Sequence, residues 1–98
     1  MKFTLVRRIH FHSANTGLVS KYVAKDVESE VSPQVGFDVE DSAWHRNDHT
    51  KIESISIDSE TGQCTVNLNS KEVGAASDVE SIFNIAVQHH GWRNWLEG

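Results

Sequence analysis

The sequence predicts an α+β domain with two layers, in which about four strands form a mainly antiparallel sheet and two helices cover one of its faces. Two observations carry this prediction. Residues 1–12 alternate between apolar and polar side chains, and residues 51–91 combine a hairpin pattern with a helical pattern. With the segments between them, the predicted order is β-α-β-β-β-α. A chain of 98 residues suits a single α+β domain over positions 1–98.

The first strand is predicted over residues 1–12. Its core-facing side would carry four apolar residues with one arginine among them: Phe3, Leu5, Arg7, Ile9 and Phe11. The opposite side would carry Thr4, Val6, Arg8, His10 and His12. The register follows from burial, because a slip by one residue would turn both phenylalanines into solvent.

The next segments are predicted as a helix, a strand and a loop. The apolar residues of 18–31 recur at helical spacing, although its valines are mediocre helix formers. Pro33, the single proline, would end this helix. Residues 35–39 alternate as a short strand, and residues 40–50 have no clear period. A loop of this length within a compact domain is often functional or mobile.

A hairpin is predicted over residues 55–68. Ile55 and Ile57 alternate with polar residues in one strand, as Val66 and Leu68 do in the other. Gly62 lies in the turn, where a positive φ is needed. Cys64 alternates inward with the valine and leucine, so we expect a buried small apolar residue rather than a nucleophile.

A second helix is predicted to begin at Ser77 and to end near Gly91. Ser77 and Glu80 have the spacing of a capping box, and Gly91 stands where a left-handed C-cap residue would. The apolar stripe of this helix consists of Val79, Ile82, Phe83, Ala86 and Val87. We expect this stripe to lie across the apolar face of the hairpin.

Composition favours a soluble cytoplasmic protein. The formal net charge of −5 and the mean hydropathy of −0.44 argue against non-specific binding to nucleic acid or to anionic membranes. No apolar run approaches the roughly 20 residues that cross a bilayer, and no signal-peptide pattern opens the chain. The single cysteine excludes an internal disulfide, which makes the cytoplasm the expected compartment.

Tryptophan and arginine residues gather in the predicted loop and at the C-terminal end. These are Trp44, Arg46, Trp92, Arg93 and Trp95. This combination is typical of binding hot spots, and its position outside the periodic elements favours contact with a partner. The alternative is that the tryptophans pack at the edge of the core of a small domain.

Histidine residues suggest a second type of site. Arg8, His10 and His12 would point the same way from the first strand, where they could hold an anion or, through the two imidazoles, a metal ion. His45 and His49 are four residues apart in the predicted loop. Together the four histidines could supply nitrogen ligands for Zn²⁺ or another divalent transition metal, although their spacing matches no recognised motif.

We therefore expect a small acidic protein-binding module, like an immunity protein or an inhibitor, that acts by occupying a macromolecular partner. The partner would be another protein, more basic than this chain. No coherent catalytic set is present, so binding is favoured over enzymatic activity and no cofactor is expected. The alternative is a metal-dependent or histidine-dependent enzyme, or a small-ligand binder. Its site would combine the Arg8, His10 and His12 face with the predicted loop that carries His45 and His49. A homodimer through that face is a third hypothesis.

Overall fold

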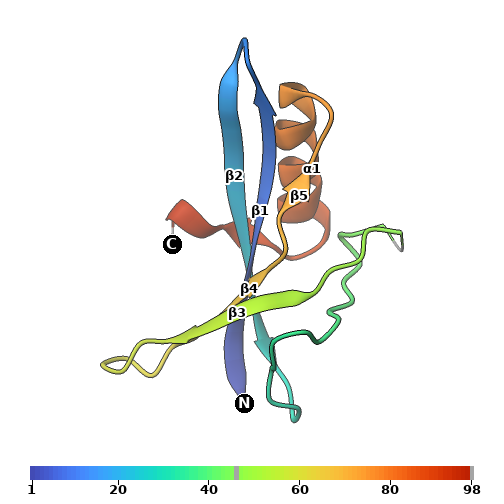
Figure 1. Cartoon of the computed structure of the whole chain (residues 1–98). Helices are drawn as coiled ribbons and strands as arrows, with labels where there is room; N and C mark the ends of the chain where they lie inside the picture. The colour runs from blue at the N-terminus through green and yellow to red at the C-terminus, as the bar shows by residue number, and fades with distance from the viewer. Residues whose placement is uncertain (46, 98) are drawn as a thin grey trace.

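A long hairpin forms the spine of the fold in the computed structural model (Figure 1), which describes residues 1–45 and 47–97. Strand β1 (Lys2–Ser13) pairs antiparallel with β2 (Gly17–Glu28) along its whole length. The turn closes with Gly17 at a φ of 71°, a value that glycine adopts without strain. The predicted first strand is confirmed, and its apolar face is buried as expected at Leu5 and Ile9.

Four shorter strands complete the sheet. They are β3 (Ile52–Ile57), β4 (Cys64–Leu68), β5 (Lys71–Glu72) and β6 (Arg93–Asn94). The spatial order is β3-β4-β1-β2-β6, and β5 pairs with β1 beyond the end of β4. Both β4 and β5 run parallel to β1, whereas the β3–β4 and β1–β2 pairs are antiparallel. The predicted β3–β4 hairpin is confirmed, with Gly62 at positive φ in its turn.

Helix α1 spans Ala76–His89, and a single 3₁₀ turn, η1 (Trp95–Glu97), follows β6. The predicted capping box is wrong, because the N-cap is Ala75, which has no side-chain cap, and Ser77 lies inside the helix. The C-terminal prediction is confirmed. Gly91 has a φ of 78°, and the amides of His90 and Trp92 both donate to the carbonyl of Ala86.

The predicted fold class is wrong in two respects. The sheet is mixed rather than mainly antiparallel, and the described residues contain one α-helix rather than two. The predicted helix over residues 18–31 is strand β2. Val19, Val23 and Val27 are four residues apart, a spacing that fits one face of a helix and also one face of a strand. Their β-branched side chains favour the strand, and pairing with β1 stabilises it.

The predicted strand over residues 35–39 is reduced to an isolated bridge between Asp38 and Lys51. Around this bridge, the amides of Gly36 and Val39 donate to the carbonyls of Ile52 and Thr50. The segment therefore lies against the beginning of β3 without forming a strand of its own.

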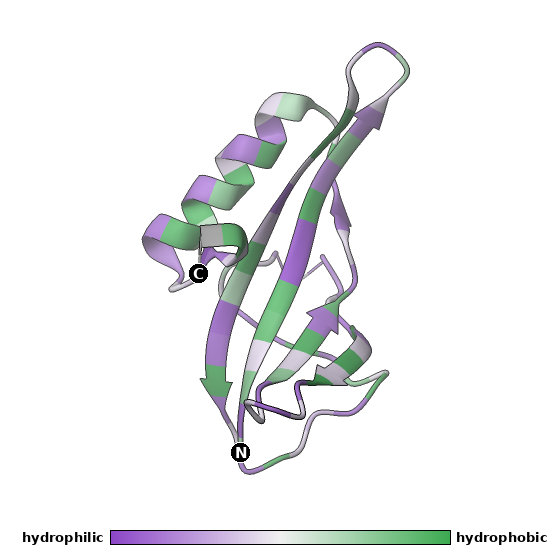
Figure 2. Cartoon of the chain, turned by 90° about the vertical axis from the view of Figure 1, so that its left-hand side faces the viewer, coloured by the Kyte–Doolittle hydropathy of each residue, from purple (hydrophilic) through white to green (hydrophobic). Residues whose placement is uncertain are grey.

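The two faces of the hairpin differ. Helix α1 lies beside the β1–β2 hairpin (Figure 2) and packs chiefly against these two strands. The face that it covers carries Leu5, Ile9 and Val23. The sequence predicted that this helix would lie across the β3–β4 hairpin, and that prediction is wrong. The core consists of Leu5, Ile9, Val23, Trp44, Ile52, Cys64, Val66, Leu68, Val79, Phe83, Ala86 and Trp92. No helix in the described ranges has both the length and the apolar character needed to cross a membrane.

Candidate functional site

The segment over residues 40–50 is fastened to the sheet by a buried ion cluster. Both terminal nitrogens of the Arg7 guanidinium lie 2.9 Å from the two carboxylate oxygens of Asp48. The Nε of Arg7 donates to the carbonyl of Asn69, at the break between β4 and β5, and Lys71 donates a further hydrogen bond to Asp48. Burial opposes ionisation of Asp48, but the hydrogen bonds from Arg7 and Lys71 outweigh it and lower the pKa of this carboxyl.

A second carboxylate fastens the beginning of the same segment. Asp41 accepts hydrogen bonds from the ammonium of Lys25 at 2.7 Å, from the indole of Trp92 at 2.9 Å and from the amide of Ala43. Lys25 also donates to the carbonyl of His90 at the end of α1. Burial acts against ionisation of Asp41, yet these hydrogen bonds lower its pKa. The segment is thus an anchored part of the fold.

Two of the predicted partner-binding tryptophans lie in the core. Trp44 and Trp92 are only 8% and 2% exposed, and their ring centroids are 5.3 Å apart. The guanidinium of Arg7 lies over the Trp44 ring at 4.6 Å, a cation–π contact. This matches the alternative in which the tryptophans pack at the core edge.

Two other members of the predicted partner-binding set, Arg93 and Trp95, are more accessible than the buried tryptophans. Trp95 and Arg93 are half-buried, the guanidinium of Arg93 lies 5.6 Å from the Trp95 ring, and it also bonds Asp26. A role for these two residues in partner binding stays a prediction. Arg46, the fifth member of the set, falls outside the described residues.

The predicted histidine pairs lie on different sides of β1. His10 and His12 share a face with Arg8, whereas the segment that carries His45 and His49 is held on the Arg7 side through Asp48. Within residues 1–45 and 47–97, no three histidine, cysteine or acidic side chains are close enough to hold a metal ion. The structure therefore does not assemble the four proposed metal ligands into one site.

A pocket of about 640 Å³ lies along the anchored segment. Its lining includes His45, His49 and the acidic residues Asp38, Glu40, Asp41 and Asp48. Three of these carboxylates already pair with Lys51, Lys25 and Arg7. The negative charge of these three carboxylates is therefore largely compensated by basic residues of the protein, which makes the pocket a poor cation site.

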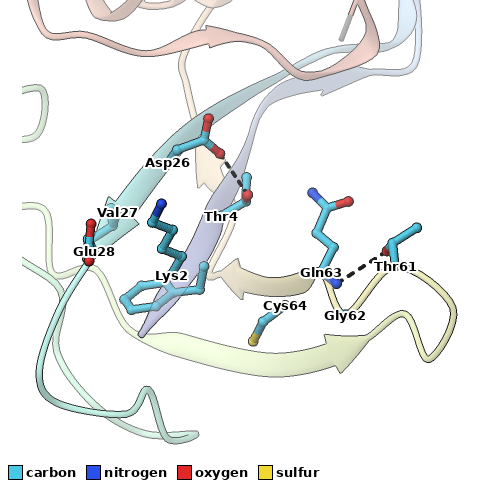
Figure 3. A pocket seen from close by; sticks show the side chains of 10 residues that line it. Lys2, Thr4, Asp26, Val27, Glu28, Thr61, Gly62, Gln63 and Cys64 are labelled. Atoms are coloured by element: carbon cyan, nitrogen blue, oxygen red, sulfur yellow. Dashed lines mark hydrogen bonds between the residues drawn. The ribbon is translucent and has the colours of Figure 1, made fainter.

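A second cleft, of about 530 Å³, lies where the ends of β1 and β2 approach the β3–β4 turn (Figure 3). Its charged lining residues are Lys2, Asp26 and Glu28, and Asp26 is already bonded to Thr4. Cys64 also lines it but is 5% exposed, as predicted for a buried small residue. No histidine is among the lining residues of this cleft, so the cleft does not contain a Cys–His pair.

The outer edge of β3 is open along most of its length. The segment over 36–39 covers Ile52, but no backbone hydrogen bond joins residues 53–57 to any described residue on that side. Asp58 donates its amide across the turn to Gln63, so by alternation the amides of Ile55 and Ile57 point away from β4. Ile57 is 69% exposed.

Sequence reasoning missed the residues that anchor the 40–50 segment, namely Lys25, Asp41, Asp48 and Lys71. One signal was present, because an arginine within the apolar face of the first strand requires a buried acid. The choice among fourteen acids depends on the tertiary structure. The chain matches no known family model, curated protein or solved structure. Its function has to be inferred from its own geometry.

Proposed function

We propose that this protein is a binding module that captures an extended segment of a partner protein along the outer edge of β3. The observation that carries the proposal is the open edge beside Ile55 and Ile57. An edge strand presents a row of backbone donors and acceptors, and recognition by strand addition uses them directly.

The composition of β3 supports this proposal. Natural edge strands are commonly guarded by lysine, proline or inward charges, which prevent pairing with other chains. The β3 sequence IESISI has one charged residue and no proline. Isoleucine favours the extended conformation, so this edge is suited to accept another strand.

The charge around the edge favours a basic segment. Glu53, Asp58 and Glu60 are exposed along β3 and its turn, whereas Lys51 is paired with Asp38. A partner strand that carries lysine or arginine would complement this charge and would associate faster. Because the chain as a whole carries a net charge of −5, long-range steering would act in the same direction.

Selection from a displayed library of random peptides tests this proposal. The peptides should have about ten residues, so that each is long enough to form a strand. We expect enrichment of peptides rich in β-branched and basic residues. Ile57→Pro removes an outward amide and should abolish their binding, whereas β4 pairing should survive because that amide does not face β4. Ile57→Lys, which guards the edge without a backbone change, should weaken binding as well.

Two outcomes would overturn the proposal. Selected peptides that bind Ile57→Pro and Ile57→Lys as well as the parent protein would place the binding surface elsewhere. Light scattering that shows a stable dimer, dissociated by the same two variants, would make a second copy of this chain the occupant of the edge.

A further inference from the structure

The face of the hairpin away from α1 carries a block of four polar side chains. Register pairs Arg8 with Tyr22 and His10 with Ser20, so the four residues form two successive cross-strand pairs on one face. Facing side chains in such pairs are about 5 Å apart, and successive pairs on one strand are about 7 Å apart. We call these four residues the Arg8 block.

All four members of the Arg8 block are half-buried, yet none of their side chains makes a hydrogen bond within the described part of the chain. The Nε of Arg8 and the Nδ1 of His10 are both buried without a partner. Burying a polar group without a hydrogen bond costs roughly 1–3 kcal/mol. The rest of both side chains is partly exposed, so the block presents polar groups to solvent whose hydrogen bonds are not made within the described residues.

Charge pairing singles out Arg8. Among the described lysines and arginines, Arg7, Lys21, Lys25, Lys51, Lys71 and Arg93 all pair with carboxylates. Lys2 and Arg8 form no ion pair with a described residue, and Lys2 is exposed whereas Arg8 is half-buried. In a protein with more acids than bases, a half-buried guanidinium without a carboxylate is a specific feature.

We propose that the Arg8 block binds the phosphate group of a small molecule. Arg8 would donate a pair of parallel hydrogen bonds to two phosphate oxygens. The Tyr22 and Ser20 hydroxyls and the His10 imidazole would donate to the remaining oxygens. A phosphate suits this arrangement better than a carboxylate, because it offers acceptors to donors on both strands. This site does not depend on the edge of β3.

One acidic residue opposes the ligand. Glu72 of β5 is paired in register with His10, and its carboxylate lies 4.0 Å from the Nε2 of His10. Glu72 is largely exposed and can turn away, but its charge repels an anion. Glu72→Gln should therefore tighten phosphate binding, a gain of function that a merely structural role for the block would not give.

Nuclear magnetic resonance titration with inorganic phosphate and with phenyl phosphate tests the proposal. We expect saturable shifts of the Arg8 Nε–H signal and of the Tyr22 and Ser20 amides. Arg8→Gln should weaken binding by at least about tenfold, since a charge-assisted bidentate contact is lost. Tyr22→Phe keeps the packing of the ring and should weaken phosphate binding several-fold. This variant provides a second test if Arg8→Gln fails to fold.

Lys2→Gln is the matched control, because it removes the same charge from the same strand about 20 Å away. At about 0.15 M ionic strength the Debye length is about 8 Å, so this variant should bind phosphate nearly as well as the parent protein. Equal losses in Lys2→Gln and Arg8→Gln would reduce the effect to net charge and overturn the proposal. Acetate binding as tightly as phosphate, or no saturable shift, would overturn it too.

Discussion

The side chains of Arg7 and Asp48 meet as a bidentate ion pair, with each terminal guanidinium nitrogen 2.9 Å from a different carboxylate oxygen. This contact joins the centre of β1 to a segment 41 residues further along the chain. The arginine side chain is fully buried, whereas the aspartate side chain is 17% exposed and also bonds Lys71. The two ends of the pair are therefore unequally protected.

This inequality predicts unequal effects of substitution. Asp48→Ala leaves a buried guanidinium without its carboxylate and should lower the free energy of unfolding by about 3–5 kcal/mol. Arg7→Met keeps an apolar side chain in the core and leaves Asp48 with Lys71, so it should cost less. Urea denaturation measures both values. Lys51→Met, which breaks only the exposed pair with Asp38, should leave stability nearly unchanged. A larger decrease in the free energy of unfolding for Arg7→Met than for Asp48→Ala would contradict this account.

Acid should destabilise the protein through Asp41 and Asp48. Burial opposes ionisation of both carboxyls, but the hydrogen bonds they accept lower each pKa below its ordinary value of 3.8. Well above pH 3.8 both carboxyls are ionised in the folded and in the unfolded protein, and the stabilisation is complete. As the pH falls below this value, the unfolded chain binds protons first and the free energy of unfolding drops. In urea denaturation, the stability difference between the parent protein and Asp48→Asn should therefore narrow as the pH falls. A difference that is constant with pH would contradict this account.

The two buried tryptophans should differ when each is replaced by phenylalanine. The indole nitrogen of Trp92 donates to Asp41, whereas that of Trp44 is buried without an acceptor among the described residues. Trp92→Phe leaves a buried carboxylate oxygen with one donor fewer and should cost about 1–3 kcal/mol. Trp44→Phe removes a buried group that has no hydrogen-bond partner, along with some packing. It should therefore lower the free energy of unfolding by less than Trp92→Phe does. Denaturation monitored by circular dichroism compares the two, and the reverse order would refute the assignment.

The apolar–polar pattern of the sequence predicted those elements in which the pattern fits only one type of secondary structure. Strand β1 and the β3–β4 hairpin alternate over enough residues to specify both strand and face. Strand β2 does not, because Lys21 and Lys25 stand on its core-facing side between valines. Their long side chains reach Glu80 and Asp41, which lets a strand face carry lysine over apolar neighbours. That outcome depends on where α1 and the 40–50 segment pack.

The candidate sites also differ in how far local sequence could predict them. The shared face of Arg8 and His10 followed from alternation alone, and the strand register then added Ser20 and Tyr22 from β2. The placement of His45 and His49 followed instead from the ion pair between Arg7 and Asp48. A contact across 41 residues of sequence has no local signature, so the sequence could not separate these histidines from His10 and His12.

Hydrogen exchange should reveal the open edge of β3 in the absence of any partner. The amides of Ser54 and Ser56 face β4 by the alternation set at Asp58, whereas those of Ile55 and Ile57 face solvent. Unbonded amides exchange without a local opening step, so we expect Ile55 and Ile57 to exchange at least about tenfold faster than the two serines. A peptide bound along the edge should slow the isoleucine amides alone. Equal protection of all four amides in the free protein would show that the edge is already covered, and strand addition would then lose its basis.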